Sequence, residues 1–455
     1  MNAASLHATA CIGCRRRGRK CDRTLPTCLS CEKRGVQCEG YVTKWPGVAA
    51  RGKLAGKSIP VVDSPTLIAG AHSRLRQRRQ KQDASKPSTP QSNFISVPDD
   101  EIEKFVEYYI AELSRIFYLG NGPSENPMFH YVLPLIDSVP PIRFALAGAA
   151  SCHIAARTSD KELEQKSLRL RVHATHLLRE MLQSPATATD QTVLASILML
   201  AQLDMCSGDC VEFHTHLKAA TAVLRNRDYD GSVNGYYFEQ RLAWLDVMSS
   251  TTSDRLPNLT IEEVKTIIGR LSRNGHRQWS YDVFPCPVEL FEIIVEITFL
   301  FKTRCLRSQS PALHIEDLQK RAHEWKCPTM SGQRKHMVEG WRLGILAYFY
   351  RLFPQVDRHK ESESLPGQVL NLAELIPPAS SWSYALLWPI FQVAVSLGDA
   401  EKEKDQIRSR LRTALKTIGC RHHSNALEML EIVWARSEEF DPYTISIPGR
   451  TIMLV

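Results

Sequence analysis

Six of the chain's thirteen cysteines lie within its first 38 residues and repeat one spacing twice. Each half reads C-x2-C-x6-C, and six residues separate the two halves. A structural zinc ion takes four ligands, so two ions need eight ligand positions where six thiolates supply only six. Two sulfurs must therefore bridge, and the symmetry of the repeat predicts Cys11 and Cys28 as that pair. The predicted ligands are Cys11, Cys14, Cys21, Cys28, Cys31 and Cys38.

Disulfide bonds are the alternative use of these cysteines, because an even number permits them. Disulfides need an oxidising compartment, and residues 1–10 contain neither the charged nor the apolar stretch of a secretory signal. The other seven cysteines are scattered and odd in number, as expected of a reduced chain. We therefore predict two structural zinc ions. Six thiolates outweigh the charge of two divalent ions, so the cluster needs cationic neighbours.

Cationic side chains fill five of the six positions between Cys14 and Cys21, and we expect them on a short helix. A basic helix end that is fixed by metal fits the major groove of DNA. Arginine can pair with guanine through two donors, while further cations neutralise phosphates. The alternatives are a solvated charge run or counter-ions for the thiolates, but the run is longer than charge balance requires. The predicted DNA-contacting residues are Arg15, Arg16, Arg17, Arg19, Lys20 and Arg23.

These stretches together resemble the fungal zinc cluster (Zn2Cys6) transcription factors. The resemblance covers Cys11 to Asp22, Leu25 to Cys31 and Gly35 to Cys38. It implies a binuclear cluster in which two short helices are joined by a loop that turns at Pro26, with the first helix reading a CGG-type triplet of DNA.

The same resemblance implies roles for single residues. Arg15 and Lys20 match positions that usually contact phosphates or base edges, and Arg17 matches a basic position. Many members of the family have a lysine that reads a base where this chain has Gly18. Arg17 and Arg19 are therefore the candidates for that role here.

Charge is distributed unevenly along the chain. Residues 1–45 contain nine lysines and arginines against three acidic residues, and residues 46–98 contain nine against two. Because the whole chain has a net charge of only +8, the remainder must be mildly acidic. A basic end that faces DNA is thus joined to an acidic body.

Residues 46–98 are rich in proline, serine, glycine and glutamine and predict a flexible basic linker. One basic cluster in the linker predicts a nuclear import signal, although a phosphate contact or a solvated segment fits the same pattern. The linker has no heptad repeat, which argues against a coiled-coil dimer at this point and leaves a homodimer formed elsewhere open. The cluster consists of Arg74, Arg76, Arg78, Arg79 and Lys81.

From Pro98 onward, apolar residues recur at steps of three and four, which predicts amphipathic helices. The first helix follows Ser96 as its cap and has an acidic first turn at Asp99, Asp100 and Glu101. Few stretches alternate with period two, and no apolar run reaches about 18 residues, so we expect an all-α body without a membrane span. The further predicted helices cover about 141–157, 161–183, 187–205, 210–226, 236–250, 287–303, 334–353, 381–396, 401–418 and 424–437.

The body also resembles the fungal-specific transcription factor domain that follows the zinc cluster in one branch of the family. The resemblance implies a helical domain that regulates activity and binds partners or effectors, and it implies no catalytic residues. The stretches that carry it are Asn126-Pro127, Phe144 to His153, Leu194 to Gly208, His216 to Ala220, Trp244 to Val247, Leu387 to Phe391 and Trp434 to Arg436.

One group in the body has soft ligands near metal spacing: Cys206, Cys210, His214 and His216. Residues 207–209 read as a turn, and two histidines two positions apart face different sides of a helix. Ordinary core cysteines therefore fit better than a second metal site. His173 and His176 share a helical face but have no third ligand nearby. The chain also lacks nucleotide-binding and nucleophile motifs, so we expect no enzyme.

The sequence therefore predicts a nuclear, sequence-specific transcription factor that acts on RNA polymerase II promoters through double-stranded DNA and through co-regulators or the transcription machinery. CGG-like sites and a metabolic or secondary-metabolite pathway are expectations from the resemblance. The alternative is a zinc-stabilised interaction module that a partner recruits to DNA. The predicted fold is mainly α, with a zinc cluster at 8–45, the flexible basic linker at 46–98 and an all-α regulatory domain at 99–455.

Overall fold

The computed structural model divides into two compact units, Met1–Asn93 and Phe94–Val455. It describes residues 10–23, 28–36, 38, 47, 48, 58, 59, 97–120, 126–184, 187–227, 233–270, 279, 283–303, 312–327, 330, 332–354, 359–378, 380–435, 452 and 454. The predicted import cluster at 74–81 lies outside the described residues.

The described residues of the first unit form four short elements. Two helices, α1 (Ile12–Arg16) and α2 (Leu29–Glu32), each carry one C-x2-C pair at their start. Two strands, β1 (Gly47–Val48) and β2 (Ser58–Ile59), pair antiparallel within the segment predicted as linker. The two short helices hold the two cysteine pairs of this unit.

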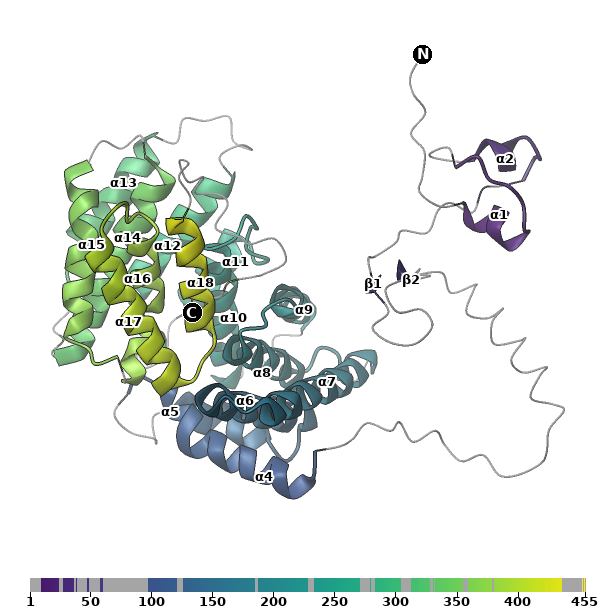
Figure 1. The fold of residues 1–455 in the computed structure, drawn as a ribbon, viewed down its shortest axis with the longest axis horizontal. Coiled ribbons are helices and arrows are strands. Elements are labelled where there is room, and N and C mark those ends of the chain that lie inside the picture. Colours follow the sequence, from purple (N-terminus) through teal and green to yellow (C-terminus); the bar gives the residue numbers. More distant parts are fainter. Residues whose placement is uncertain are drawn as a thin grey trace, which may run out of the picture. The chain divides into compact units, whose positions relative to one another are not determined.

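Every secondary-structure element that the structure describes in the second unit is helical, which confirms the predicted all-α class (Figure 1). In Figure 1, α6 and α7 lie side by side, and the helices α12 to α17 form a separate upright group. The elements are α4 (Asp99–Tyr108), η1 (Tyr109–Leu113), α5 (Ser114–Ile116), η3 (Met128–Val132), η4 (Leu133–Leu135), α6 (Pro140–Thr158), α7 (Lys161–Gln183), α8 (Gln191–Ser207), α9 (Phe213–Asn226), α10 (Val233–Ser250), α11 (Ile261–Ile268), α12 (Val288–Thr303), α13 (Ala312–Glu324), α14 (Gly332–Leu352), α15 (His359–Glu374), η6 (Ser381–Leu386), α16 (Leu387–Ala394), α17 (Glu401–Ile418) and α18 (His422–Trp434).

Side-chain caps and glycines fix several of these helix ends. The carboxylate of Asp160 accepts the N–H groups of Glu162 and Leu163 at the start of α7, and that of Asp190 accepts the N–H of Thr192 at the start of α8. At the other end of α8, Gly208 takes a φ of +71°, a left-handed conformation that glycine adopts without strain. The predicted turn after Cys206 is therefore confirmed, and it brings α9 back beside α8.

The start of the first helix differs from the prediction. Pro98 occupies the cap position of α4 and makes no side-chain hydrogen bond, while Ser96 lies outside the described residues. The acidic first turn is present as predicted. The helix then widens into the π-helical segment η1, where the buried Tyr109 hydroxyl accepts a hydrogen bond from Gln202 Nε2 at 2.8 Å.

Small residues allow α6 to pack closely against both α7 and α8. The carbonyl of Gly148 accepts a hydrogen bond from Ser167 Oγ of α7 at 2.8 Å. A Cβ added at Gly148 would lie 3.0 Å from a Leu203 methyl of α8. This close approach buries the alanines of α6, and the three helices form one side of the core.

Three tryptophans form an aromatic cluster that joins α10 to the group α12 to α17. Trp341 of α14 stacks on Trp388 of α16 with ring centroids 5.1 Å apart, and Trp244 of α10 lies 5.5 Å from Trp341. Gly344 lets α14 approach α16, because a Cβ at this position would lie only 2.8 Å from the backbone of Pro389. All three indoles are almost completely buried, so this cluster joins α10, α14 and α16.

Four helical segments were not predicted from the sequence: Met128–Leu135, α11, α13 and α15. The first is a π-helix followed by a 3-10 turn, α11 has only eight residues, and α15 contains Pro366 in its interior. Short length and an internal proline both weaken the periodic signal on which helix prediction depends.

The described residues contain no single helix that is long and apolar enough to cross a membrane. One pair of segments, Met128–Leu135 and Pro140–Thr158, passes a test of length and composition together but is bent by 114°.

Candidate metal centre and nucleic-acid interface

The cysteine module, residues 10–38, places its six sulfurs in two overlapping groups of four. Within each group all ligand atoms lie within 4.8 Å of one another. The two groups share Cys11 and Cys28, the pair that the symmetry of the sequence singles out as bridges. The groups are Cys11, Cys14, Cys21 and Cys28, and Cys11, Cys28, Cys31 and Cys38.

The sulfurs of the four inner cysteines lie close together at the centre of the module. The Sγ atoms of Cys11 and Cys28 are 3.6 Å apart, and those of Cys14 and Cys31 are 3.7 Å apart. These four side chains are at most 1% exposed, whereas Cys21 and Cys38 are half-buried. Each group offers four sulfur donors, which is the number and type that structural zinc requires. The residues present therefore fit two zinc ions.

Backbone N–H groups orient the sulfurs in the same way in both halves. The N–H of Cys14 donates to Cys11 Sγ, and the N–H of Cys31 donates to Cys28 Sγ, both at 3.3 Å. The N–H groups of Cys11 and Cys28 likewise donate to Cys21 and Cys38, both at 3.4 Å. Matching bonds at matching offsets show that the doubled sequence unit folds as a doubled structural unit.

Two glycines end the two helices with the same geometry. Gly18 and Gly35 each have a φ of +61°. After each glycine the chain turns back, so that Arg19 N–H bonds the carbonyl of Cys14 at 2.9 Å and Val36 N–H bonds that of Cys31 at 3.1 Å. Such bonds from a residue to the fifth one before it are typical of a glycine-terminated helix. The equal offset of the two glycines from Cys14 and Cys31 is a sequence signal that the prediction missed.

The basic run is thus only partly helical, which corrects the expectation of a helix between Cys14 and Cys21. Helix α1 begins at Ile12 and ends at Arg16, because Gly18 turns the chain out of the helix. Four basic side chains of the run are exposed to solvent, and Arg23 beyond it is exposed as well. The four are Arg16, Arg17, Arg19 and Lys20.

Asp22 connects the two halves, a role that the sequence analysis did not assign. Its carboxylate accepts the N–H groups of Leu29 at 3.0 Å and of Ser30 at 2.6 Å, at the start of α2. A carboxylate at this position satisfies free donors and interacts favourably with the helix dipole. The residue that directly follows the third cysteine thereby positions the second half of the module.

Burial affects the acidity of the cysteines strongly. It raises the pKa of the Cys11 thiol to about 12 and raises that of Cys28 further. At Cys21 burial acts in the same direction, but the N–H groups of Cys11 and Arg23 outweigh it and lower the pKa. Without metal the thiols of Cys11 and Cys28 would therefore keep their protons at neutral pH, so that zinc binding must displace them.

The second cysteine and histidine group of the sequence has other partners in the structure. His216 Nδ1 lies 2.9 Å from the buried carboxylate of Asp204, and the thiol of Cys210 points at the Asp204 carbonyl at 3.6 Å. Among the residues that the structure describes, only the two groups of the cysteine module could hold a metal ion. His173 packs edge-on against Phe144, with ring centroids 4.3 Å apart.

Comparison with known proteins agrees with both parts of this structure. Residues 9–45 match the fungal Zn(2)-Cys(6) binuclear cluster domain, and residues 104–445 match the fungal specific transcription factor domain. No curated protein and no solved structure matches the chain.

A binuclear zinc cluster that precedes a helical regulatory domain defines a class of DNA-binding regulators of transcription. The chain belongs to the family of fungal transcription factors that carry the fungal specific transcription factor domain, and its cluster binds two zinc ions. These domains point to a regulator rather than an enzyme and imply a nuclear protein.

Proposed function

We propose that the chain is a sequence-specific regulator of RNA polymerase II promoters that recognises CGG-like DNA sites. The observation that carries this proposal is the position of the basic run, whose exposed side chains extend from the end of α1 beside the buried sulfur cluster. A pathway-specific role in metabolic or secondary-metabolite genes is part of the proposal and follows from the family. It is supported by no single residue.

In this proposal the six cysteines hold the two zinc ions, and Cys11 and Cys28 serve both. Zinc supplies a rigid centre for a module whose described buried cluster consists of cysteines. The protein's own cationic side chains contact the DNA in this proposal, and the turn at Gly18 sets the direction in which the basic residues leave α1. Arg15 belongs to the proposed contacts by its place in α1.

The base readers in this proposal are Arg17 and Arg19, which flank Gly18. A guanidinium can donate two hydrogen bonds to the O6 and N7 atoms of one guanine, which lysine cannot do with the same geometry. Arg16, Lys20 and Arg23 then serve as phosphate contacts that position the module on the duplex. The proposed import signal at 74–81 brings the chain into the nucleus.

The test is selection from a random pool of double-stranded DNA with the full, zinc-loaded chain at two salt concentrations, followed by sequencing of the bound fraction. Enrichment of a CGG-like triplet, single or paired, is the expected result. Binding that weakens with salt and enriches no sequence would refute specific reading. It would favour the alternative in which the zinc module is an interaction surface and a partner supplies DNA recognition.

A further inference from the structure

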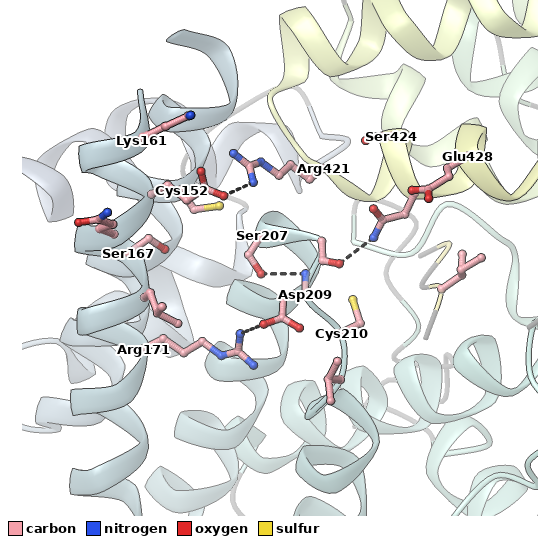
Figure 2. Close-up of a pocket in the computed structure, with 17 residues that line it drawn as sticks. Cys152, Lys161, Ser167, Arg171, Ser207, Asp209, Cys210, Arg421, Ser424 and Glu428 are labelled. Carbon is pink, nitrogen blue, oxygen red and sulfur yellow. Dashed lines mark hydrogen bonds and ion pairs between the residues drawn. The ribbon is translucent and has the colours of Figure 1, made fainter. Parts of the chain in front are cut away.

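The second unit contains a cavity of about 810 Å³ between helix α7, the turn from α8 to α9, and the start of α18 (Figure 2). Ile452 and the thiol-bearing Cys152 of α6 also line it. Binding sites for small organic molecules commonly have volumes of about 300–1,000 Å³. Residues from five parts of the sequence thus line a space of the right size for a small ligand.

One end of this cavity is cationic. Arg421 pairs with Glu164 through a single guanidinium nitrogen, and its backbone N–H bonds the carbonyl of Cys206. Lys161, on the same side of the cavity in Figure 2, makes no hydrogen bond or close ion pair with a described residue, although the hydrogen bond from Arg421, together with the charge of Lys161, lowers the pKa of Glu164. Most side-chain donors of Arg421 and all those of Lys161 are therefore available to an anion.

The start of α18 adds to this preference. Arg421 occupies the N-cap position of α18, but its side chain makes no capping hydrogen bond. Ser424, in the first turn of this helix, lines the cavity. The free N–H groups at a helix start favour negative charge. This helix start coincides with the two cations and with the cavity that they line.

The acidic side chains of the cavity are already engaged. Glu164 pairs with Arg421, and Asp209 pairs with Arg171 at 2.7 Å. Glu428, which lies at the opposite side of the cavity in Figure 2, also has a partner. Arg421 keeps guanidinium donors beyond the one that it gives to Glu164, and Lys161 makes no close ion pair with a described residue, so an anion finds more open donors here than a cation finds open acceptors.

Two of the exposed residues that line the cavity are apolar. Leu168 of α7 is 56% exposed and Val211 of the α8–α9 turn is 61% exposed, although both are large aliphatic residues. Both line the cavity, together with Ile452. An apolar chain seated against these residues would remove them from water. The lining therefore offers both cationic and apolar side chains to an amphipathic molecule.

We propose that this cavity is a binding site for a small amphipathic carboxylate. The carboxylate pairs with Arg421 and Lys161, and the aliphatic part covers Leu168, Val211 and Ile452. The ligand then contacts α7, the α8–α9 turn and α18 at once, so its binding stabilises their relative positions. The site is independent of the zinc cluster, and its test involves no DNA.

The experiment titrates the full, zinc-loaded chain with straight-chain carboxylates from hexanoate to dodecanoate, by calorimetry and by thermal melting of the helical unit. We expect saturable binding of at least one chain length and a Tm that rises with its concentration. The alcohol of the same length should bind at least about tenfold more weakly, because it lacks the charge that Arg421 and Lys161 recognise.

Three variants locate the site. Arg421→Gln should weaken the best carboxylate about tenfold or more, and the exposed Lys161→Gln about threefold. Val211→Trp should block the cavity without affecting folding, because this side chain faces solvent. Arg169→Gln is the matched control, since Arg169 is exposed on the same helix but does not line the cavity.

Three results would overturn the proposal. One is the absence of saturable binding across the whole carboxylate series. Another is equal affinity for the alcohol, which would show that the cations play no role. The third is unchanged affinity in both Lys161→Gln and Val211→Trp, two variants that leave the core intact and so separate loss of the site from loss of the fold.

Discussion

The cysteine module and the helical unit differ in what they bury. In the module, the buried hydrophobic cluster of the described residues consists of Cys11, Cys14, Cys28 and Cys31. In the helical unit, the buried cluster draws aliphatic and aromatic side chains from α4 through α18, including the tryptophans of α10, α14 and α16. The module therefore has sulfur where the helical unit has hydrocarbon.

This difference determines what each part needs in order to fold. Apolar burial stabilises in proportion to the area removed from water, and the helical unit is large enough to bury a great deal of it. A module of about thirty residues cannot do so and depends on its ligand bonds. Stability of one part should therefore be separable from stability of the other.

The two parts of the chain also differ in symmetry. The module repeats its hydrogen bonds, glycine turns and cysteine positions in two halves, as in the pairs Gly18 and Gly35 or Cys14 and Cys31. The helical unit has no such repeat in its charged cavity, which is assembled from α7, α18 and a turn. In the module, each cysteine and the glycine of one half therefore have twins in the other half that serve as natural controls.

The largest expected effect is that of zinc removal on the module alone. A chelator, or the substitution Cys14→Ala, should unfold the module and abolish specific DNA binding, since structural zinc contributes about 10–16 kcal/mol in small zinc-dependent peptides. The melting temperature of the helical unit should not change. Gel-shift titration and circular dichroism on the full chain measure the two effects separately.

Cys327→Ala is the control for that experiment, because Cys327 is a partly buried thiol of the helical unit. It should leave both zinc content and DNA binding as they are. Specific binding that survives in Cys14→Ala would show that the module does not depend on its metal, and the contrast between the two parts would disappear.

The reverse experiment removes core from the helical unit. Trp341→Ala should lower the free energy of unfolding of this unit by about 3–5 kcal/mol, because a buried indole between two other indoles leaves a large cavity. DNA binding by the module should remain within about twofold of the original affinity. Thermal melting reports the first effect, and fluorescence anisotropy with labelled DNA reports the second.

A partly buried tryptophan gives the matched comparison. Trp325→Ala should cost clearly less than Trp341→Ala, because Trp325 lies at the edge of the core. Equal losses would mean that burial does not determine the stability of the unit. A parallel loss of DNA affinity would mean that the two parts fold as one.

Much of the helical unit could be predicted from the sequence where the apolar pattern was long and uninterrupted. The predicted helix 161–183 has the bounds of α7, and 401–418 has those of α17. The predicted start at 187 was four residues early, since Asp190 rather than the preceding segment caps α8. A proline inside α15 concealed that helix.

The candidate sites differ in the same respect. The cysteine spacing is local, so the six ligands could be predicted from it, and both groups of four sulfurs in the structure consist of these cysteines. The cavity could not be predicted, because Lys161, Asp209 and Arg421 come together only through the packing of α7 and α18. No local pattern in the sequence records a juxtaposition of residues so far apart.

The proposed DNA contacts allow the two halves of the module to be compared. Arg17→Ala should weaken specific binding by about 1–3 kcal/mol and relax one base position if this side chain reads a guanine edge. Its twin in the second half is Arg34, which is also exposed. Arg34→Ala should cost less and affect all sequences alike. Repeating the DNA selection with each variant measures both effects.

A uniform loss across all sequences in Arg17→Ala would identify a phosphate contact instead of a base reader. Base reading would then fall to Arg19, and Arg19→Ala would be the variant that relaxes a position. If Arg17→Ala and Arg34→Ala weaken DNA binding equally, neither half of the module is specialised for reading bases, and the proposed role of α1 is wrong.

The smallest expected effect concerns the two glycines. Gly18 and Gly35 have the same φ of +61°, and a Cβ added at either would meet no atom within 4 Å. Gly18→Lys and Gly35→Lys should therefore each destabilise the zinc-loaded module by about 1 kcal/mol, through backbone strain rather than collision. Chelator titration, followed by the loss of zinc, compares the two.

Only Gly18→Lys places its new charge in the basic run. The two variants should therefore differ in DNA preference, although they lose similar stability. Gly18→Lys adds a cation between Arg17 and Arg19, and we expect it to shift the selected sequence toward CGG, because it restores the lysine common at this position in the family. Gly35→Lys adds the same charge in the other half and should raise affinity for all sequences slightly. An identical shift in both would mean that added charge alone changes the preference, and that the geometry of the turn at Gly18 does not direct the reading of bases.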